Sequence, residues 1–440
     1  MASSAAPARL GLRDDYSLNR VPDGERYSVL TIIIQRFASF TALAKFLLGA
    51  TLGFSLAFWP AFWAITIGVV ILEIVSVLTG LIAQREGLNT TLLARWTGLG
   101  QIGSGILALV IAFSLIGWFG VQNGIFAEGL HEVFPGVGVA VWSILTGVAV
   151  TLVVAYGFRV MQWLAYIVVP IFILVMAYSF DVAMRGHALS SLIAITGGGH
   201  GLTLLTAVTA VAGGTIVGAI TSPDMARYNK STWDVIGQSV IGITLGEYPV
   251  ALIGVLMAHI AHTNNITAIL LTSSGAIGML LVVTATLKIN DWNLYSSSLG
   301  VANFVDVLWR TKWNRGTVAL ILGLAGTVLS AVGILNAFVP FLDILGVLIP
   351  PAAGIMIVEY YLFPYSKSRL NTLKDPASDW APRLNAAALV SWAIGFLVGE
   401  FWHWGIATIN ALVLAAVVYA VIRALMGTKV YTGVGETTQS

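Results

Sequence analysis

Long apolar runs with very few charges recur along this chain, and they limit its possible folds more than any other feature. A helix needs about 20 mostly apolar residues to cross a bilayer, and in lipid only helices and closed barrels satisfy the backbone. The alternating segments of about ten residues that build a barrel do not occur here. The sequence therefore predicts an all-α polytopic membrane protein. Twelve spans are expected, at 28–56, 58–83, 101–127, 137–157, 160–183, 202–222, 234–258, 275–303, 316–337, 338–362, 384–401 and 405–426.

Composition excludes the main alternatives. Of the 440 residues, 58% are hydrophobic and only 10% are charged, whereas a soluble domain has about 25% charged residues. This rules out a water-soluble globule and a disordered chain. The formal net charge of +2 provides no basic field for nucleic acid, and the lack of cysteine excludes disulfides, thiol nucleophiles and cysteine metal sites. Neither a metal nor another cofactor is expected.

The basic residues predict the orientation. With both termini in the cytoplasm, 18 of the 22 Lys and Arg residues fall in inner loops and tails, and one falls in an outer loop. This is the asymmetry that the positive-inside rule describes. Three cations remain inside predicted spans: Arg36, Lys45 and Lys288. Charges within a membrane are costly and usually functional, so these three are the informative ones.

Trp118 lies well inside the third span, and Gln122 follows it by four residues. Side chains at this spacing share a helix face. An indole plane beside a carboxamide suits a flat ring that both stacks and forms hydrogen bonds. Helix packing, with Gln122 bonded to a neighbouring helix, explains the pair equally well.

Two later spans carry signs of interruption. Three glycines at 213–218 weaken the sixth span, and broken helices expose backbone groups to ligands in transporters. Close helix contact is the alternative interpretation of these glycines. Pro350 and Pro351 should kink the tenth span.

The eighth span carries a polar set that must face protein or water, because it is expensive in lipid. The set comprises Lys288, Asn290, Asp291 and Asn293. Asp291, together with Asp343 of the tenth span, is a candidate partner for a buried cation.

Several segments together resemble the nucleobase–cation symport family, in its bacterial cytosine-permease branch. They lie in the same order across nearly the whole chain, at 87–95, 117–122, 222–228, 290–296 and 349–361. The resemblance implies a LeuT-type fold in the inner cell membrane. Spans 1–5 and 6–10 would be inverted repeats, spans 11 and 12 would be appended, and spans 1 and 6 would be interrupted at the substrate site.

The implied organisation divides the chain into seven parts. In order they are a short, mostly flexible cytoplasmic tail (1–27), the first five-helix repeat (28–184), an extracytoplasmic loop (185–201), the second, inverted repeat (202–363), a cytoplasmic loop (364–383), two further helices (384–426) and a cytoplasmic C-terminal tail (427–440).

The resemblance also implies a substrate site. In relatives, the tryptophan that matches Trp118 stacks on the substrate ring, and Gln122 matches an amide of hydantoin-type relatives. The implied set is completed by Gly214, Thr215, Val217, Asn290 and Asn293. Cytosine-type relatives have a glutamine in place of Leu115, and an aromatic residue and a serine in place of Thr215 and Val217. Cytosine itself is therefore not implied as the substrate.

The largest departure from the family lies at the cation site. Sodium-coupled relatives bind Na⁺ with carbonyls that would be those of Ala38 and Thr41, plus two hydroxyls of span 8. At the matching positions this chain has Lys288 and Ile289. We hypothesise Na⁺-independent transport in which the Lys288 ammonium replaces the ion. Loss of its proton in one state would couple transport to H⁺; the alternative is a permanent charge and simple facilitation.

Lys45 lies near the expected break in span 1, where relatives carry a small residue. Two roles are open. Lys45 contacts an anionic or carbonyl-rich substrate, or it pairs with Asp343 or another buried carboxylate. Pairing is slightly favoured.

The leading hypothesis is a secondary transporter that imports a planar, nucleobase-like heterocycle by alternating access. The alternative is a transporter on the same fold for a vitamin-like heterocycle or a small anion. An enzyme is not expected, because the longest inner loop, 364–383, carries no catalytic motif. The expected partners are the heterocyclic solute, the lipid bilayer and, if transport is proton-coupled, H⁺. Nucleic acid is not expected, and a monomer is the simplest assembly.

Overall fold

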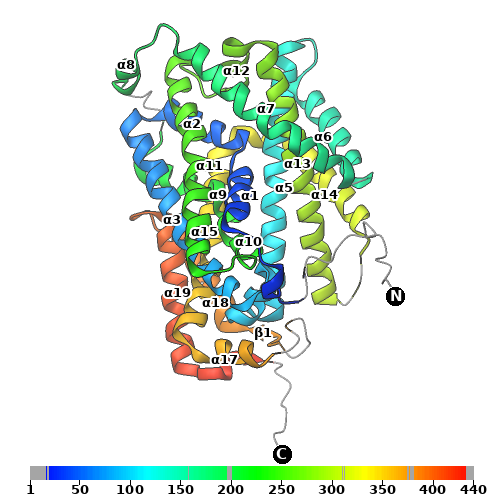
Figure 1. Ribbon diagram of the computed structural model, residues 1–440, viewed down its shortest axis with the longest axis vertical. Coiled ribbons are helices and arrows are strands. Elements are labelled where there is room, and N and C mark those ends of the chain that lie inside the picture. Colours follow the sequence, from blue (N-terminus) through cyan, green and yellow to red (C-terminus); the bar gives the residue numbers. More distant parts are fainter. Residues whose placement is uncertain are drawn as a thin grey trace, which may run out of the picture.

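The computed structural model describes residues 16, 19–156, 158–195, 201–309, 311, 313–373, 376 and 381–432. It is mainly helical, and the helices form an elongated bundle (Figure 1). Helices α8 (Leu189–Ile193) and α12 (Ile266–Ser274) lie at one end, named the α12 end. Helix α17 (Pro364–Thr372) and strand β1 (Leu384–Asn385) lie at the other, named the α17 end.

Helices lie at every predicted span. Those of the first half are α1 (Val29–Phe40), α2 (Leu43–Ser55), α3 (Phe58–Glu86), α4 (Thr90–Ala94), α5 (Gly100–Val133), α6 (Val139–Tyr156) and α7 (Phe158–Met184). Those of the second half are α9 (Leu204–Ile220), α10 (Ser222–Ala226), α11 (Thr232–Ala261), α13 (Ala276–Trp309), α14 (Arg315–Ala331), α15 (Phe338–Leu348) and α16 (Pro350–Leu362). They are followed by α18 (Ala386–Phe401) and α19 (Ala407–Met426).

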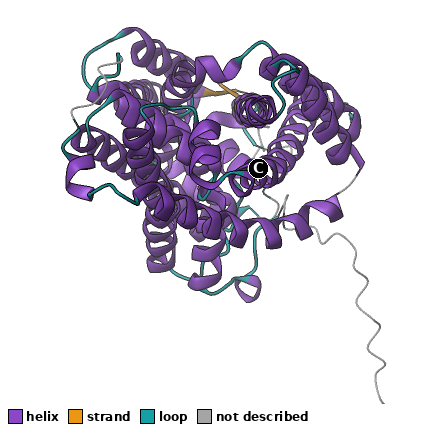
Figure 2. Cartoon of the chain, turned by 90° about the horizontal axis from the view of Figure 1, so that it is seen from above, coloured by secondary structure: helices purple, strands orange, loops and turns teal. Residues whose placement is uncertain are grey.

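The all-α prediction needs one small correction. Strand β1 pairs antiparallel with β2 (Tyr431–Thr432), which brings the chain after α19 back beside the start of α18. Viewed from above, this short pair is embedded among helices (Figure 2). Short helical turns complete the described elements: η1 (Asp23–Glu25), η2 (Arg95–Leu99), η3 (Ile334–Ala337) and η4 (Gly427–Val430).

Five helical stretches of the described chain are long and apolar enough to cross a membrane, judged by length and composition. They are Phe58–Glu86, Thr90–Val133, Thr232–Ala261, Ile334–Leu362 and Ala407–Val430. Shorter apolar helices occupy several of the other predicted spans. The number of helices that cross the membrane stays a prediction.

The first predicted span is broken, as expected. Helix α1 ends at Phe40, Thr41 and Ala42 are extended, and α2 begins at Leu43. Thr41 caps α1, because its amide and its hydroxyl both donate to the Phe37 carbonyl at 2.9 Å. The tenth span is also divided where the two prolines predicted a kink, between α15 and α16.

The sixth span is not broken where we predicted. Helix α9 continues through residues 213–218, and the chain turns only at Thr221, before α10. The glycines provide close contact instead: a Cβ on Gly213 would collide with the Leu342 backbone, and one on Gly218 would collide with the Phe40 ring. Tight packing on α15 and α1 therefore outweighs the low helix propensity of glycine here.

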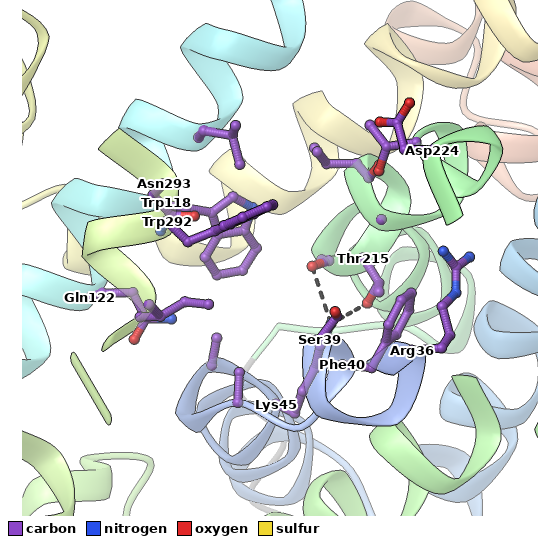
Figure 3. Close-up of a pocket in the computed structure, with 18 of the residues that line it drawn as sticks. Arg36, Ser39, Phe40, Lys45, Trp118, Gln122, Thr215, Asp224, Trp292 and Asn293 are labelled. Atoms are coloured by element: carbon purple, nitrogen blue, oxygen red, sulfur yellow. Dashed lines mark hydrogen bonds between the residues drawn. The ribbon is translucent and has the colours of Figure 1, made fainter. Parts of the chain in front are cut away.

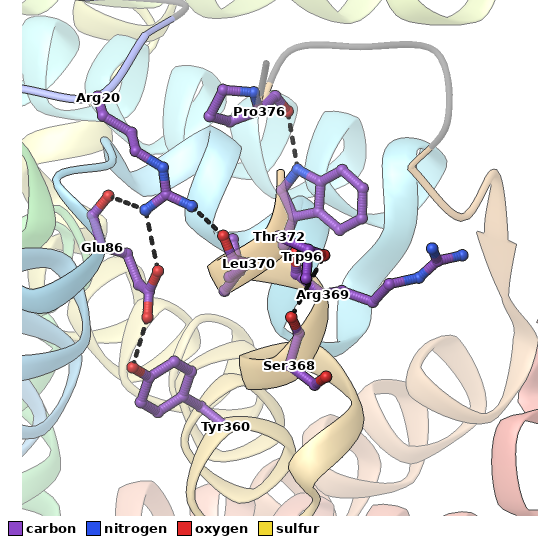
Figure 4. A network of polar contacts seen from close by, with 9 residues as sticks. All are labelled: Arg20, Glu86, Trp96, Tyr360, Ser368, Arg369, Leu370, Thr372 and Pro376. Atoms are coloured by element: carbon purple, nitrogen blue, oxygen red, sulfur yellow. Dashed lines mark hydrogen bonds and ion pairs between the residues drawn. The ribbon is translucent and has the colours of Figure 1, made fainter. Parts of the chain in front are cut away.

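The last part of the predicted N-terminal tail makes specific contacts, whereas residues 1–15, 17 and 18 lie outside the described residues. Arg20 donates from Nη1 to the Glu86 carboxylate at 3.0 Å, and from Nη2 to the Leu370 carbonyl (Figure 4). The Tyr360 hydroxyl donates to the other Glu86 oxygen at 2.7 Å. Arg20 thereby fastens the tail to α3 and α17 at the α17 end, and Tyr360 of α16 shares the Glu86 carboxylate with it.

Candidate functional site

A cavity of about 220 Å³ lies beside the break between α1 and α2. Side chains of α5 and α13 form one wall of it: Trp118, Gln122, Trp292 and Asn293 (Figure 3). The α1–α2 region and α9 supply the facing side, with Phe40, Lys45 and Thr215. The broken span therefore meets the predicted aromatic–amide motif across one small cavity.

Trp118 is fixed in its wall by aromatic neighbours. Its indole packs edge-on against Phe341, with ring centroids 5.4 Å apart, and against Phe338 at 6.1 Å. Both phenyl rings come from α15. Edge-to-face packing of this kind favours one ring orientation, so the indole is held ready to stack on a flat ring in the cavity.

Gln122 shares the cavity wall with Trp118, which confirms the prediction that the two side chains share a helix face. Gln122 is 1% exposed, and its Oε1 has no hydrogen-bond partner among the described residues. A buried polar atom without a partner is uncommon and calls for an explanation. A hydrogen-bond donor on a bound ligand would satisfy this oxygen. The packing alternative, in which Gln122 bonds a neighbouring helix, lacks that bond at Oε1.

The two predicted asparagines of α13 occupy different places. Asn293 lines the cavity, and its Nδ2 donates to Asn290 Oδ1 at 3.4 Å. Asn290 is fully buried behind it and donates to the Phe119 carbonyl at 3.3 Å. Asn290 is not among the residues that line the cavity, so it holds Asn293 and ties α13 to α5.

Lys45, in the first turn of α2, is paired with a carboxylate. Its Nζ lies 3.2 Å from Glu247 Oε1 of α11 and also donates to the Gly214 carbonyl at 3.2 Å and to the Thr215 hydroxyl. The partner is therefore Glu247 rather than Asp343, whose Oδ1 has no hydrogen-bond partner among the described residues. An ammonium has three donors, and here protein acceptors take all three.

Three predicted residues of α9 lie at this contact or beside it. Gly214, Thr215 and Val217 all line the cavity. Thr215 accepts from Lys45 and donates its hydrogen to the Glu247 carboxylate, whose two oxygens lie 2.8 and 2.9 Å away. Helix α9 thus contributes one backbone carbonyl and one side-chain hydroxyl to the ion pair.

The predicted cation site is described only in part. Thr41 directly follows the last residue of α1, and Ile289 of α13 lines the cavity. The side chains of Ala38, Lys288 and Asp291 lie outside the described residues. The assignment of Lys288 to the ion position therefore stays a prediction. Within the part of the chain that was searched, no group of three or more His, Cys, Asp or Glu side chains could hold a metal ion.

Two residues with opposite charges also line the cavity, Arg36 of α1 and Asp224 of α10. Arg36 is 1% exposed, donates to the Ser76 hydroxyl at 2.8 Å and lies over the Phe40 ring. Asp224 accepts from the Thr90 amide at 2.8 Å. The lining of the cavity therefore combines aromatic and amide side chains at Trp118 with opposite charges on α1 and α10.

A second cavity, of about 350 Å³, lies at the α12 end. Phe338, Glu128 and Asn265 are among the residues that line it. Because Phe338 also packs on Trp118, this ring stands between the second cavity and the first.

A second buried ion pair lies away from both cavities. Glu359 of α16 accepts from Arg423 Nε at 3.0 Å and Nη2 at 3.3 Å. The hydroxyls of Tyr419 and Ser366 donate to the same carboxylate at 2.8 and 2.7 Å. The Arg423 guanidinium also lies 5.0 Å from the ring centroid of Phe363. This cluster joins α16, α17 and α19.

Sequence reasoning missed several residues of the site. Glu247 was visible as a carboxylate inside a predicted span, but no sequence pattern connects it with Lys45, 202 positions earlier. Arg36 was singled out as an intramembrane charge but was not assigned to the site. Phe338 and Phe341 carried no signal, because aromatic residues are common in membrane helices.

Comparison with known proteins finds one family over most of the chain. The profile of a family described as permeases for cytosine/purines, uracil, thiamine and allantoin matches residues 21–422.

Individual relatives agree with this match. The chain is 26% identical to the cytosine permease of Escherichia coli strain K12 over an alignment of 422 residues, which covers 94% of this chain and 96% of that permease. It is 24% identical to the hydantoin permease of Microbacterium maritypicum over an alignment of 337 residues, which covers 70% of this chain and 68% of that permease. Among solved structures, the inward-facing conformation of Mhp1 has a TM-score of 0.78 at 21% identity, covering 97% of this chain and 96% of Mhp1.

Proposed function

The chain belongs to the family of permeases for cytosine/purines, uracil, thiamine and allantoin, and we propose that its cavity binds a planar, nucleobase-like heterocycle for import by alternating access. The protein is a multi-pass membrane transporter of the secondary type and not an enzyme.

The wall shared by Trp118 and Gln122 carries this proposal. It places an indole next to a carboxamide oxygen that lacks a partner among the described residues. A heterocycle offers what both groups require, a flat face for the indole and an N–H donor for Gln122 Oε1. Asn293, in the same wall, adds a second amide.

The size and charge of the cavity favour a small, neutral ring. Its volume of about 220 Å³ is below the range of ~300–1,000 Å³ found for drug-sized ligands. Lys45 lines the cavity, but its three donors are bound to Gly214, Thr215 and Glu247. A vitamin-like heterocycle or a small anion stays the alternative, because an anion could compete with Glu247 for the ammonium. In that case Lys45 would contact the solute directly.

Alternating access is supported by the break between α1 and α2, which lies at the cavity. In transporters with broken helices, one bundle rocks against another around a central site. We propose that 28–184 and 202–363 are inverted five-helix repeats and that α18 and α19 complete twelve spans. We also propose that the α17 end and both termini face the cytoplasm of a monomer in the inner membrane, because 18 of 22 basic residues fall on that side of the predicted topology.

We propose further that transport does not need Na⁺. The two hydroxyls of span 8 that bind Na⁺ in sodium-coupled relatives are replaced by Lys288 and Ile289. A lysine ammonium at that position would repel a metal cation and supply the same charge. Ala38 and Thr41 would offer it carbonyl acceptors.

Binding is tested by the thermal stability of the purified protein with a panel of uracil, cytosine, hypoxanthine, hydantoin, thiamine and nicotinate. A heterocycle should raise the melting temperature of the wild type and leave that of Trp118→Ala unchanged. Trp233→Ala is the matched control, because Trp233 is 77% exposed and does not line the cavity. A shift with nicotinate alone would support the anion alternative, and no shift with any member would contradict both.

Coupling is tested by uptake of the stabilising compound into proteoliposomes. We expect equal uptake with an imposed Na⁺ gradient and with a choline gradient. Stimulation by Na⁺ would refute the proposal that Lys288 replaces the ion.

A further inference from the structure

Lys45 and Glu247 form an ion pair at the centre of the bundle, next to the cavity. The pair joins three helices, because Lys45 belongs to α2, Glu247 to α11 and the intervening Thr215 to α9. The side chains are 7% and 0% exposed. Two opposite charges are therefore held away from water in a protein in which only 10% of the residues are charged.

The two partners differ in their access to the cavity. Lys45 lines it, whereas Glu247 of α11 is not among the lining residues. A proton that enters or leaves through the cavity therefore meets the lysine nitrogen first. The Thr215 hydroxyl bridges the two groups, because it accepts from Nζ and donates to the carboxylate. Loss of the proton at Nζ can therefore alter the hydrogen bond that Glu247 receives from Thr215.

A lysine in such a place can exist in two protonation states, unlike an arginine. With the proton bound, the Lys45 ammonium pairs with Glu247 and donates one hydrogen bond to each of its three acceptors, which are the Gly214 carbonyl, the Thr215 hydroxyl and the Glu247 carboxylate. Without it, the amine keeps two hydrogens, the ion pair is lost and one acceptor is left unsatisfied. The proton thus decides how firmly α2 is tied to α9 and α11. Because α2 begins directly after the extended residues Thr41 and Ala42, it is not continuous with α1 and can shift relative to it.

Other charged groups around the pair set its electrostatic environment. Glu73 of α3 accepts from Thr244 at 2.6 Å and lies within electrostatic range of Glu247, and Tyr248 lies one residue after Glu247. Arg36 of α1 and Asp224 of α10 line the same cavity. Helices α9 and α12 carry no titratable side chain, and the side chains of Lys288 and Asp291 on α13 lie outside the description.

We propose that the Lys45–Glu247 pair is the site at which a proton is taken up and released, so that the solute is carried together with H⁺. This rests on the proposed transport function and adds its coupling ion and the group that binds it. On the outer side the Lys45 amine takes a proton from a hydronium ion and leaves water. On the inner side the ammonium gives the proton back to water, and no other bond is made or broken.

The test compares two transport modes in proteoliposomes, using whichever of uracil, cytosine, hypoxanthine or hydantoin binds in the stability panel. Counterflow at equal pH reports exchange of the solute and needs no net movement of protons. Net uptake with and without a pH gradient of one unit reports coupling. For one proton per neutral solute, and with the outside more acidic and the membrane potential held at zero by K⁺ and valinomycin, the wild type should accumulate about tenfold more with the gradient, since one pH unit corresponds to a tenfold ratio.

Lys45→Arg and Glu247→Gln are the informative variants. The first keeps a cation that cannot release its proton, and the second removes the charge that holds it. Counterflow is expected to fall but to stay measurable in both, while the ratio of uptake with and without the gradient drops to about 1. The matched control is Arg423→Lys, in the other buried pair, which should keep the wild-type ratio.

The outcomes separate this proposal from the proposed function. No counterflow in the wild type with any member would refute transport of these heterocycles. Counterflow without a response to pH in the wild type, or a wild-type ratio in either variant, would overturn proton coupling at this pair alone. For a variant that does not turn over, solute affinity is measured as a function of pH. The affinity of the wild type should fall as the pH rises and the pair loses its proton, whereas that of the variants should not depend on pH; a wild-type pH dependence in either variant overturns the proposal.

Discussion

The buried ion pairs Lys45–Glu247 and Arg423–Glu359 resemble each other closely in composition but differ in their surroundings. In each, the carboxylate is 0% exposed and accepts hydrogen bonds from a cation and from at least one hydroxyl. The cation beside the cavity is a lysine, and the one at the α17 end is an arginine held among aromatic rings.

This difference has a chemical consequence. An arginine is charged under all physiological conditions, whereas a buried lysine exchanges its proton readily. The Arg423 pair can therefore only fasten helices together. The Lys45 pair can fasten them in one protonation state and loosen them in the other. Burial alone does not distinguish a structural charge from a functional one; the identity of the cation and its access to a cavity do.

The largest effect is expected from Arg423→Met. It leaves the Glu359 carboxylate buried with only hydroxyl partners, and breaking a buried pair in this way typically costs about 3–5 kcal/mol. Unfolding of the purified protein by denaturant should show this loss, while the surviving protein should bind solute as the wild type does. A loss below about 1 kcal/mol would mean that the pair does not fasten the α17 end.

Removing one hydroxyl from each pair is the next strongest comparison. Thr215→Val and Tyr419→Phe each delete one donor to a buried carboxylate, and hydrogen bonds to charged groups contribute about 1.5–3 kcal/mol. Both variants should lose stability to a similar extent in denaturant unfolding. Only Thr215→Val should also reduce the response of uptake to a pH gradient. Equal effects on that response would erase the distinction between the two regions.

Trp118→Ala tests the cavity side of the comparison through binding. Loss of stacking between a base and an aromatic side chain costs about 1–3 kcal/mol. We expect a decrease in solute affinity of this size by calorimetry, with a smaller decrease for Trp118→Phe. An unchanged affinity would assign Trp118 to packing against Phe338 and Phe341.

The smallest effect on stability is expected from the double variant Lys45→Met with Glu247→Leu. Replacing both partners of a buried pair by apolar residues of similar size is often neutral or stabilising, so unfolding should change by no more than about 1 kcal/mol. Uptake should nevertheless no longer respond to a pH gradient. A destabilisation as large as that of Arg423→Met would show that the pair near the cavity is structural too.

Sequence patterns predicted the parts of this site that lie close together in the chain. Trp118 and Gln122 were placed on one face by their spacing of four, and both line the cavity. The two prolines after Leu348 marked the division between α15 and α16. In these cases helix geometry alone relates the residues involved.

Local sequence signals were misleading where packing against neighbouring helices determines the backbone conformation. The glycines at 213–218 suggested a break, yet α9 continues through them, because they admit α1 and α15 at close range. The break that does occur, at Thr41 and Ala42, has neither proline nor glycine. It was foreseen only through the resemblance to a family.

The sequence by itself determined that this protein spans a membrane, where its helices lie and which of its few charges are unusual, because apolar length and charge are properties of short segments. Tertiary structure decided what those charges do. Lys45 pairs with Glu247 rather than with Asp343, and Asn290 bonds to the backbone of α5 instead of lining the cavity. Such choices depend on which helices are neighbours, since a buried polar group must find its partner across the bundle and not along its own helix.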